Sequence, residues 1–215
     1  MLRRLKFRRA RERGAAASLE STHFVVLDTE LTSLDHRSNR LLSIGAIAME
    51  GTAIRLGRQF YRVVNPGVTI PAPGILVHRL RTDDVVRGDP PRLVLEELRA
   101  FLEGAVLVGH FLGIDLKALR KELDGAGHTL DNPAVDTARV HRWLLSRQQH
   151  GDDLGHRLED VSLASLARTY GLQFRESHHA LDDAFLTAQL WQKLMALLTE
   201  HGIHDLDALL RIGRA

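Results

Sequence analysis

The 215-residue sequence contains no cysteine, which excludes disulfides, cysteine-ligated zinc, iron–sulfur clusters and a thiol nucleophile. It lacks any apolar run near the roughly 18 residues that a membrane-spanning helix needs, and its N-terminus lacks the apolar stretch of a secretory signal. The P-loop pattern, H-E-x-x-H and G-x-S-x-G are also missing. We therefore expect a protein of the reducing, cytoplasmic compartment that does not enter a membrane.

Charge is distributed unevenly along the chain. Residues 1–22 hold seven Arg and Lys against two Glu, a net charge of +5, whereas the whole chain carries +2. Length and composition suit one α/β domain, which we place at residues 23–200, with a short helical extension over residues 201–215. The basic N-terminal tail has two open interpretations: attraction to nucleic acid, or a solvated extension.

Apolar patterning predicts a mixed sheet covered by helices on both faces. Short runs rich in Val, Ile and Phe predict strands at residues 23–28, 41–49, 52–64, 105–109 and 134–136. Helical periodicity predicts helices at residues 91–102, 112–123, 137 to about 146, 161–170, 181–198 and 203–212. Asp136, directly before one of these helices, is expected to be its N-cap. Three successive strands followed by alternating helices and strands favour an α/β fold.

Two carboxylates stand at the end of the first predicted strand. Side chains alternate across a strand, so Asp28 and Glu30 share one face with the apolar Phe24 and Val26. Carboxylates in such a place repel each other and lose hydration, so they require a cation. The alternative is that both lie in a solvated loop, and the D-x-E pattern alone does not decide.

The helix expected at residues 181–198 contains a third carboxylate with an unusual position. With Leu181 at 0° and roughly 100° per residue, Asp183 falls at about 200°, inside an apolar stripe. Its neighbour Asp182 falls at about 100°, on the polar face. An acid in an apolar stripe is costly unless it is paired or bound to a metal, so Asp183 is the stronger candidate ligand.

A fourth candidate, Asp115, flanks a leucine stripe directly after the strand at residues 105–109. Four oxygen ligands on separate elements suit Mg²⁺ or Mn²⁺ rather than zinc. Two divalent ions would balance four carboxylates, as in two-metal sites that cleave phosphodiesters. A histidine nearby can deprotonate the attacking water, and His178 and His179 lie just before Asp183.

Three segments resemble the motifs of the DEDDh, or DnaQ-like, 3′–5′ exonucleases, the class that contains the proofreading epsilon subunit of DNA polymerase III, ribonuclease T and oligoribonuclease. The first is VVLDTELTSLD at residues 25–35, followed by LSIGA at residues 42–46. The second is VGHFLGID at residues 108–115, and the third is HHALDDA at residues 178–184. The likeness spans about residues 23 to 198, with all three motifs in family order.

The resemblance implies a ribonuclease H-like fold with a five-stranded mixed sheet, and it assigns roles to the residues matched. Asp28, Glu30, Asp115 and Asp183 would be metal ligands, and His178 would be the general base. The implied contacts to the terminal nucleotide come from Leu31, Thr32, His78 and Phe111. This chain departs from the family pattern at Leu31, Ser33, Phe111, Ile114 and residues 79–81, all in the region where the family holds that nucleotide.

The sequence therefore predicts a metal-dependent exonuclease that releases nucleoside 5′-monophosphates from single-stranded 3′ ends of DNA or RNA, with two Mg²⁺ or Mn²⁺ ions. Two alternatives remain open. One is a proofreading subunit bound to a DNA polymerase, for which residues 1–22 and 203–215 are the spare material. The other is a catalytically weak domain that acts by binding nucleic acid.

Overall fold

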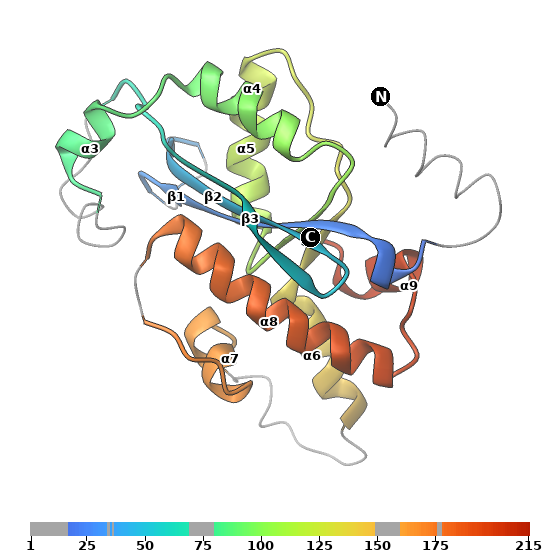
Figure 1. The fold of residues 1–215 in the computed structure, drawn as a ribbon. Helices are drawn as coiled ribbons and strands as arrows, with labels where there is room; N and C mark the ends of the chain where they lie inside the picture. The colour runs from blue at the N-terminus through green and yellow to red at the C-terminus, as the bar shows by residue number, and fades with distance from the viewer. Residues whose placement is uncertain (1–16, 34, 36, 69–79, 149–159, 176–177) are drawn as a thin grey trace.

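The structure, a computed structural model, describes residues 17–33, 35, 37–68, 80–148, 160–175 and 178–215. Within these residues a five-stranded mixed sheet has the order β3-β2-β1-β4-β5 (Figure 1). Strands β1, β2 and β3 are antiparallel neighbours, and β4 and β5 run parallel to β1. This confirms the predicted sheet. Its strands are β1 His23–Leu31, β2 Leu41–Glu50, β3 Ala53–Val63, β4 Val106–Gly109 and β5 Ala134–Asp136.

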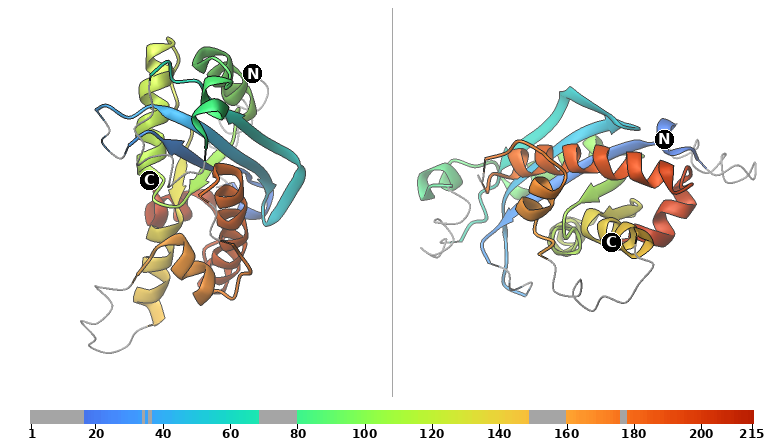
Figure 2. Two further views of the ribbon diagram at one scale, coloured as in Figure 1. Left: turned by 90° about the vertical axis from the view of Figure 1, so that its left-hand side faces the viewer. Right: turned by 90° about the horizontal axis from the view of Figure 1, so that it is seen from below.

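Helices cover both faces of the sheet, as Figures 1 and 2 show. Helices α4 and α5 pack on one face, and α6, α7, α8 and α9 pack on the other. A 3₁₀ helix, η1, precedes β1, and α3 lies between β3 and α4. The bounds are η1 Leu19–Ser21, α3 Thr82–Val86, α4 Pro91–Phe101, α5 Gly113–Gly125, α6 Thr137–Gln148, α7 Leu163–Thr169, α8 Ala180–Glu200 and α9 Leu206–Gly213.

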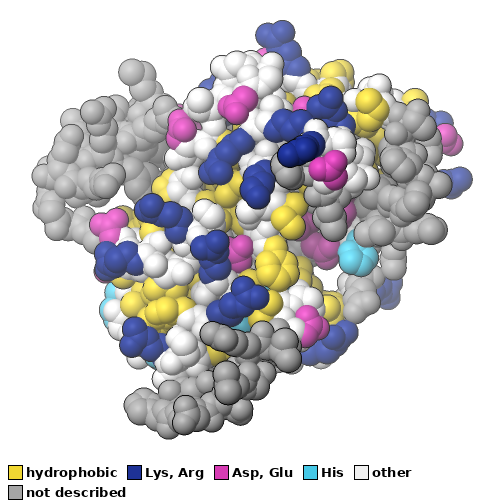
Figure 3. All heavy atoms as spheres, turned by 180° about the vertical axis from the view of Figure 1, so that it is seen from behind, with side chains coloured by type: hydrophobic (Ala, Val, Ile, Leu, Met, Phe, Trp, Pro, Cys, Tyr) yellow, Lys and Arg dark blue, Asp and Glu magenta, His cyan; other side chains and the backbone are white. Residues whose placement is uncertain are grey.

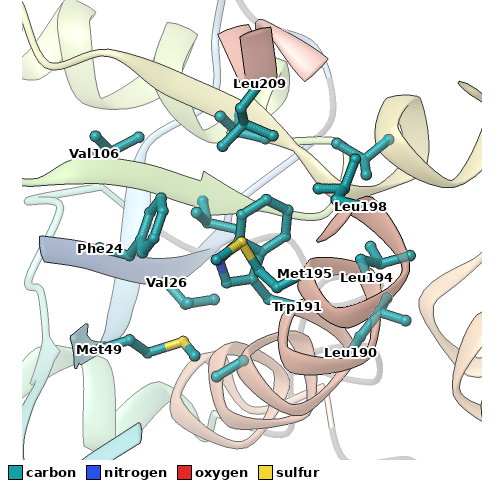
Figure 4. Close-up of a cluster of buried hydrophobic side chains, with 14 of the residues drawn as sticks. Phe24, Val26, Met49, Val106, Leu190, Trp191, Leu194, Met195, Leu198 and Leu209 are labelled. Carbon is teal, nitrogen blue, oxygen red and sulfur yellow. The ribbon is translucent and has the colours of Figure 1, made fainter. Parts of the chain in front are cut away.

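The core on the α8 side is built from the alternating residues of β1 and the apolar stripe of α8 (Figure 4). Phe24 and Val26 point toward α8, where Trp191, fully buried, meets the Phe24 ring edge-on at 5.6 Å between centroids. Side chains alternate across a strand, so the residues between them, Val25 and Leu27, join the opposite core with α4 and α5. Strand β1 is therefore apolar on both faces at its start, as central strands are.

Strand β1 is longer than the sequence predicts. The apolar pattern predicts an end at Asp28, yet the strand continues to Leu31 because β2 pairs with it throughout, Asp28 opposite Gly45 and Glu30 opposite Ser43. Within β1, the described residues that pair with β4 are only those from Phe24 to Val26. The two carboxylates thus belong to a strand segment that extends past the end of β4, rather than to a loop.

Both ends of the described chain pack against the sheet and against each other. Leu19, which the sequence assigned to the tail, is buried, and its N–H donates to the His204 carbonyl at 2.9 Å. Leu206 donates to the Ala17 carbonyl at 2.9 Å, and Leu209 of α9 is fully buried in the α8-side core. Residues 1–16 of the predicted tail lie outside the described residues. Across the described chain, none of the helices combines the length and the apolar character needed to cross a membrane.

Candidate functional site

Three carboxylates from two elements meet at the far end of β1. Asp28 and Glu30 project from β1 toward the first turn of α8, which carries Asp183. One ligand oxygen from each of the three lies within 4.8 Å of the other two, and each side chain is half-buried. Such a group of hard oxygen ligands is suited to a divalent cation such as Mg²⁺ or Mn²⁺.

Asp115 stands beside this group in the first turn of α5. It is 6% exposed, and its Oδ1 accepts hydrogen bonds from the Thr29 N–H at 2.9 Å and the Thr29 hydroxyl at 2.6 Å. Thr29 lies between the two carboxylates of β1, and strand alternation turns its side chain to the α5 face. Asp115 is outside the set of three close carboxylates, but its charge acts on Asp28 and Glu30.

Burial and mutual repulsion hold these carboxyl groups toward their neutral forms. Burial, followed by the charges of Asp115, Glu30 and Asp183, raises the pKa of Asp28 well above its ordinary value. Burial, followed by the charges of Asp183 and Asp115, raises the pKa of Glu30 to about 8. Burial raises the pKa of Asp115 to about 7 against the opposing effect of the Thr29 hydrogen bonds. A bound cation would remove this penalty, so the donor set fits a metal site.

The two adjacent aspartates of α8 have the different environments that helical phase predicts. Asp182 has a side chain 65% exposed, and its Oδ2 lies 3.8 Å from Nδ1 of His179. Asp183 faces the sheet, and burial raises its pKa while the nearby His178 opposes the rise. The helix starts at Ala180, one residue before the predicted start, without changing this phase.

The two histidines before α8 also differ. His178 is exposed and has a φ of 46°, a left-handed conformation that is uncommon outside glycine and is often found at functional sites. It lies close enough to Asp183 to offset part of the rise that burial causes in the pKa of that carboxyl group. His179 occupies the N-cap position of α8, and its ring stacks on Tyr61 with 4.5 Å between centroids.

Three of the four residues expected to contact a nucleotide are among the residues that the structure describes. Thr32 closes the β1–β2 connection, since its N–H donates to the Arg40 carbonyl and its hydroxyl accepts from the Arg40 N–H, both at 3.0 Å. Phe111 is 41% exposed with a φ of 52°. Leu31, the last residue of β1, is half-buried, and His78 lies outside the described residues.

His110 supports the exposed Phe111 ring, a role that the sequence did not suggest. The two ring centroids are 4.5 Å apart. The Nδ1 atom of His110 is 2.8 Å from the Thr137 hydroxyl, and its Nε2 is 2.8 Å from the Val161 carbonyl oxygen.

Asp136 accepts the Ala138 N–H at 2.9 Å, which confirms its predicted role as the N-cap of α6.

Comparison with known sequences gives one family. A sequence model described as Exonuclease matches residues 25–191. A DNA polymerase III subunit epsilon-like protein of Rhodobacter capsulatus is 33% identical over 199 residues, covering 91% of this chain and 27% of that protein. DNA polymerase III PolC-type of Caldanaerobacter subterraneus is 30% identical over 193 residues, covering 89% and 13%. DNA polymerase III subunit epsilon of Aquifex aeolicus is 29% identical over 196 residues, covering 89% and 90%.

The chain therefore spans about a quarter or less of the first two relatives and most of the third. Among solved structures, E. coli exonuclease I in complex with a dT13 oligonucleotide has a TM-score of 0.72 at 14% identity, covering 84% of this chain and 42% of that one. The cell-death related nuclease CRN-4 has a TM-score of 0.66 at 15% identity, covering 86% and 66%. These likenesses confirm the predicted ribonuclease H-like α/β fold.

Proposed function

The chain belongs to the exonuclease family, and from that premise we propose that it is a metal-dependent 3′–5′ exonuclease acting on single-stranded ends of DNA or RNA. The observation that carries the proposal is the meeting of Asp28, Glu30 and Asp183 within 4.8 Å, with Asp115 directly beside them. Four carboxyl groups with raised or strongly raised pKa values at one strand end are expensive to keep. Clustered carboxyl groups with perturbed pKa values are typical of functional sites, and this supports the assignment of the cluster as a metal site.

Asp28, Glu30, Asp115 and Asp183 would hold the metal. Two divalent ions there would stabilise the attacking and leaving oxygens of a phosphodiester. His178 would accept a proton from the attacking water as the water oxygen bonds to phosphorus. The bond between phosphorus and the bridging O3′ would break, and O3′ would take a proton from solvent and remain as the 3′-hydroxyl of the shortened strand. The product released would be a nucleoside 5′-monophosphate. The exposure of His178 and its closeness to Asp183 support this role.

Leu31, Thr32, Phe111 and His78 are the residues that we assign to the terminal nucleotide. The exposed Phe111 ring suits stacking on a base, which tolerates any sequence. E. coli exonuclease I, which shares the fold, has been solved with a dT13 strand, and this supports a single strand as the substrate class. In the rear view, acidic side chains lie beside a histidine, and Lys and Arg side chains are spread over the same face (Figure 3). Basic side chains on this face suit contact with a phosphate backbone.

A second candidate function is proofreading on a DNA polymerase, favoured by relatives named as polymerase III subunits. The basic residues 1–16 and the C-terminal residues are the material available for a partner. A variant lacking residues 1–16 keeps Leu19 and its contact with His204. If those residues bind nucleic acid, the variant has weaker affinity for long single strands and a flatter salt dependence. An unchanged salt dependence would leave residues 1–16 as a solvated extension or as a segment that binds a protein partner.

Matched 5′-labelled DNA and RNA oligonucleotides, incubated with Mg²⁺ or with a chelator, test the main proposal. We expect stepwise shortening from the 3′ end in Mg²⁺ only, and the preferred nucleic acid is the one shortened faster. Glu30→Gln should abolish shortening while the protein stays folded. Shortening that continues in Glu30→Gln or in chelator would contradict the proposed site. A Glu30→Gln variant that retains the cellular role would favour the hypothesis of a binding domain.

His178→Ala tests the proposed base separately. Because His178 is not a proposed ligand, this variant should lose most turnover yet keep the rise in melting temperature that Mn²⁺ causes in the wild type. Loss of the Mn²⁺ response together with activity would mean that His178 takes part in holding the metal.

A further inference from the structure

One row of residues crosses three strands beside the acidic cluster. The register places Asp28 of β1 opposite Gly45 of β2, and Gly45 opposite Tyr61 of β3. Directly opposed residues project to the same face of a sheet, here the α8 face. Gly45 contributes no side chain to this row, so a notch one residue wide separates the Asp28 carboxylate from the Tyr61 ring.

The first turn of α8 fills this notch. A Cβ atom built at Gly45 would overlap the carbonyl carbon of Ala180 and the backbone nitrogen of Leu181. Gly45 is outside the set of residues with positive φ, so its backbone would accept any residue. Glycine is therefore required for space, because the helix backbone rests directly on the strand backbone.

Tyr61 holds the other side of the same turn. Its ring stacks on His179, the N-cap residue of α8, with 4.5 Å between centroids and 29° between planes. The Asp183 N–H donates to the His179 carbonyl at 3.0 Å. Tyr61 therefore contacts the residue that is hydrogen-bonded to Asp183. We call Gly45 and Tyr61 the α8 seat.

We propose that Gly45 is a positioning residue that sets the distance of Asp183 from Asp28 and Glu30, with Tyr61 fixing the same turn from its other side. This inference rests on the proposed metal-dependent function. Because α8 is rigid over one turn, a side chain at position 45 moves Ala180 and Asp183 together. A displacement on the order of 1 Å is enough to reduce turnover by about 10²-fold, and Mg²⁺ tolerates little departure from its preferred geometry.

The test compares Gly45→Ala with Gly57→Ala. Gly57 is also a strand glycine, on β3, and no described atom beyond its chain neighbours lies within 4 Å of a Cβ built there. For each variant the melting temperature is followed as Mn²⁺ is added, and the turnover of a labelled oligonucleotide is measured in saturating Mg²⁺. We expect Gly45→Ala to need at least about tenfold more Mn²⁺ for half of its shift and to lose about 10²-fold in turnover. Gly57→Ala should match the wild type in both.

A merely structural role for Gly45 predicts a different result. In that case Gly45→Ala melts at a lower temperature in chelator but responds to Mn²⁺ at the wild-type concentration, and this outcome would overturn the proposal. If Gly45→Ala gives no folded protein, Tyr61→Leu decides, because it removes the stacked ring without adding bulk. The proposal is supported if Tyr61→Leu needs more Mn²⁺ than the wild type for its shift in melting temperature and Tyr61→Phe, which keeps the ring, does not. It is overturned if the wild type, Tyr61→Leu and Tyr61→Phe all respond equally to Mn²⁺.

The wild type separates this inference from the proposed function. A wild-type protein that neither responds to Mn²⁺ nor shortens oligonucleotides refutes the metal-dependent exonuclease itself. A wild type that does both, with Gly45→Ala indistinguishable from it, refutes only the role of Gly45.

Discussion

The two halves of β1 have opposite properties within nine residues. The segment from His23 to Leu27 is buried, is paired with β2 along its length and with β4 from Phe24 to Val26, and is apolar from Phe24 onward. The segment from Asp28 to Leu31 pairs with β2 and is half-buried. It carries two carboxyl groups whose pKa values are raised by burial and by the charges of neighbouring carboxylates.

The difference shows how a single strand serves both stability and chemistry. Its first half gains free energy of folding by burying Phe24 and Val26 against α8. Its second half loses free energy, because ionised carboxylates are brought together in a place with little hydration. Placing the costly residues on the extension of the most buried strand gives them a rigid support, as functional groups require.

The largest effect is expected from removing one charge opposite the second half of β1. Asp183→Asn keeps the size of the side chain but withdraws a proposed ligand, so turnover in Mg²⁺ should fall by several orders of magnitude. Its melting temperature in chelator should rise, because carboxylate repulsion is relieved. Asp182→Asn is the matched control, and it should leave activity within about threefold and stability within about 0.5 kcal/mol. Equal losses in the two variants would contradict the assignment of Asp183.

A change in the first half of β1 should affect stability instead. Phe24→Ala leaves a cavity beside Trp191 and should lower the free energy of unfolding by about 3–5 kcal/mol. Turnover at a temperature where the variant remains folded should stay near the wild type, because the acidic cluster is intact. Denaturant unfolding and an oligonucleotide assay on the same sample measure both quantities. A loss of activity in fully folded protein would show that the two halves are not independent.

The stability of the metal-free protein should depend on pH through the carboxyl groups at and beside the second half of β1. The pKa of Glu30 is raised from 4.5 to about 8, and that of Asp115 from 3.8 to about 7. The folded protein therefore keeps protons that the unfolded chain releases, so stability is highest in mild acid and falls as pH rises from about 4.5 to 8. The fall should amount to several kcal/mol, because each unit of pKa shift corresponds to about 1.4 kcal/mol. Saturating Mn²⁺ should reduce it, and a flat profile in chelator would mean that the carboxyl groups are not coupled.

Part of this site follows from the sequence because it depends on local periodicity. Strand alternation alone places Asp28 and Glu30 on the face of Phe24, and helical phase alone separates Asp183 from Asp182. Both regularities belong to the backbone and need no knowledge of the partner element. The structure bears out both placements.

Other features depend on contacts between distant residues and could not be predicted in this way. The length of β1 is set by pairing with β2, whose Ile44, Ser43 and Leu41 extend the ladder beyond Asp28. The bond from Thr29 to Asp115 joins residues 86 positions apart. The predicted tail boundary at Thr22 likewise missed the burial of Leu19, because the contact that covers it comes from residues near His204.

The smallest expected effect concerns the hydrogen bond from the Thr29 hydroxyl to Asp115. Thr29 lies between Asp28 and Glu30 on β1, and its side chain points to the opposite face of the sheet. Thr29→Val keeps the shape and the backbone N–H bond but removes the hydroxyl 2.6 Å from Asp115. Because that hydroxyl opposes the rise in the pKa of Asp115, the pKa of Asp115 should rise further in the variant. Turnover should then fall by less than about tenfold, and more at pH 6 than at pH 8, while stability falls by about 1 kcal/mol. Thr29→Ser keeps the hydroxyl and should restore both, as pH–rate profiles of the two variants would establish. A loss in Thr29→Val that is equal at all pH values would place the effect in packing rather than in the ionisation of Asp115.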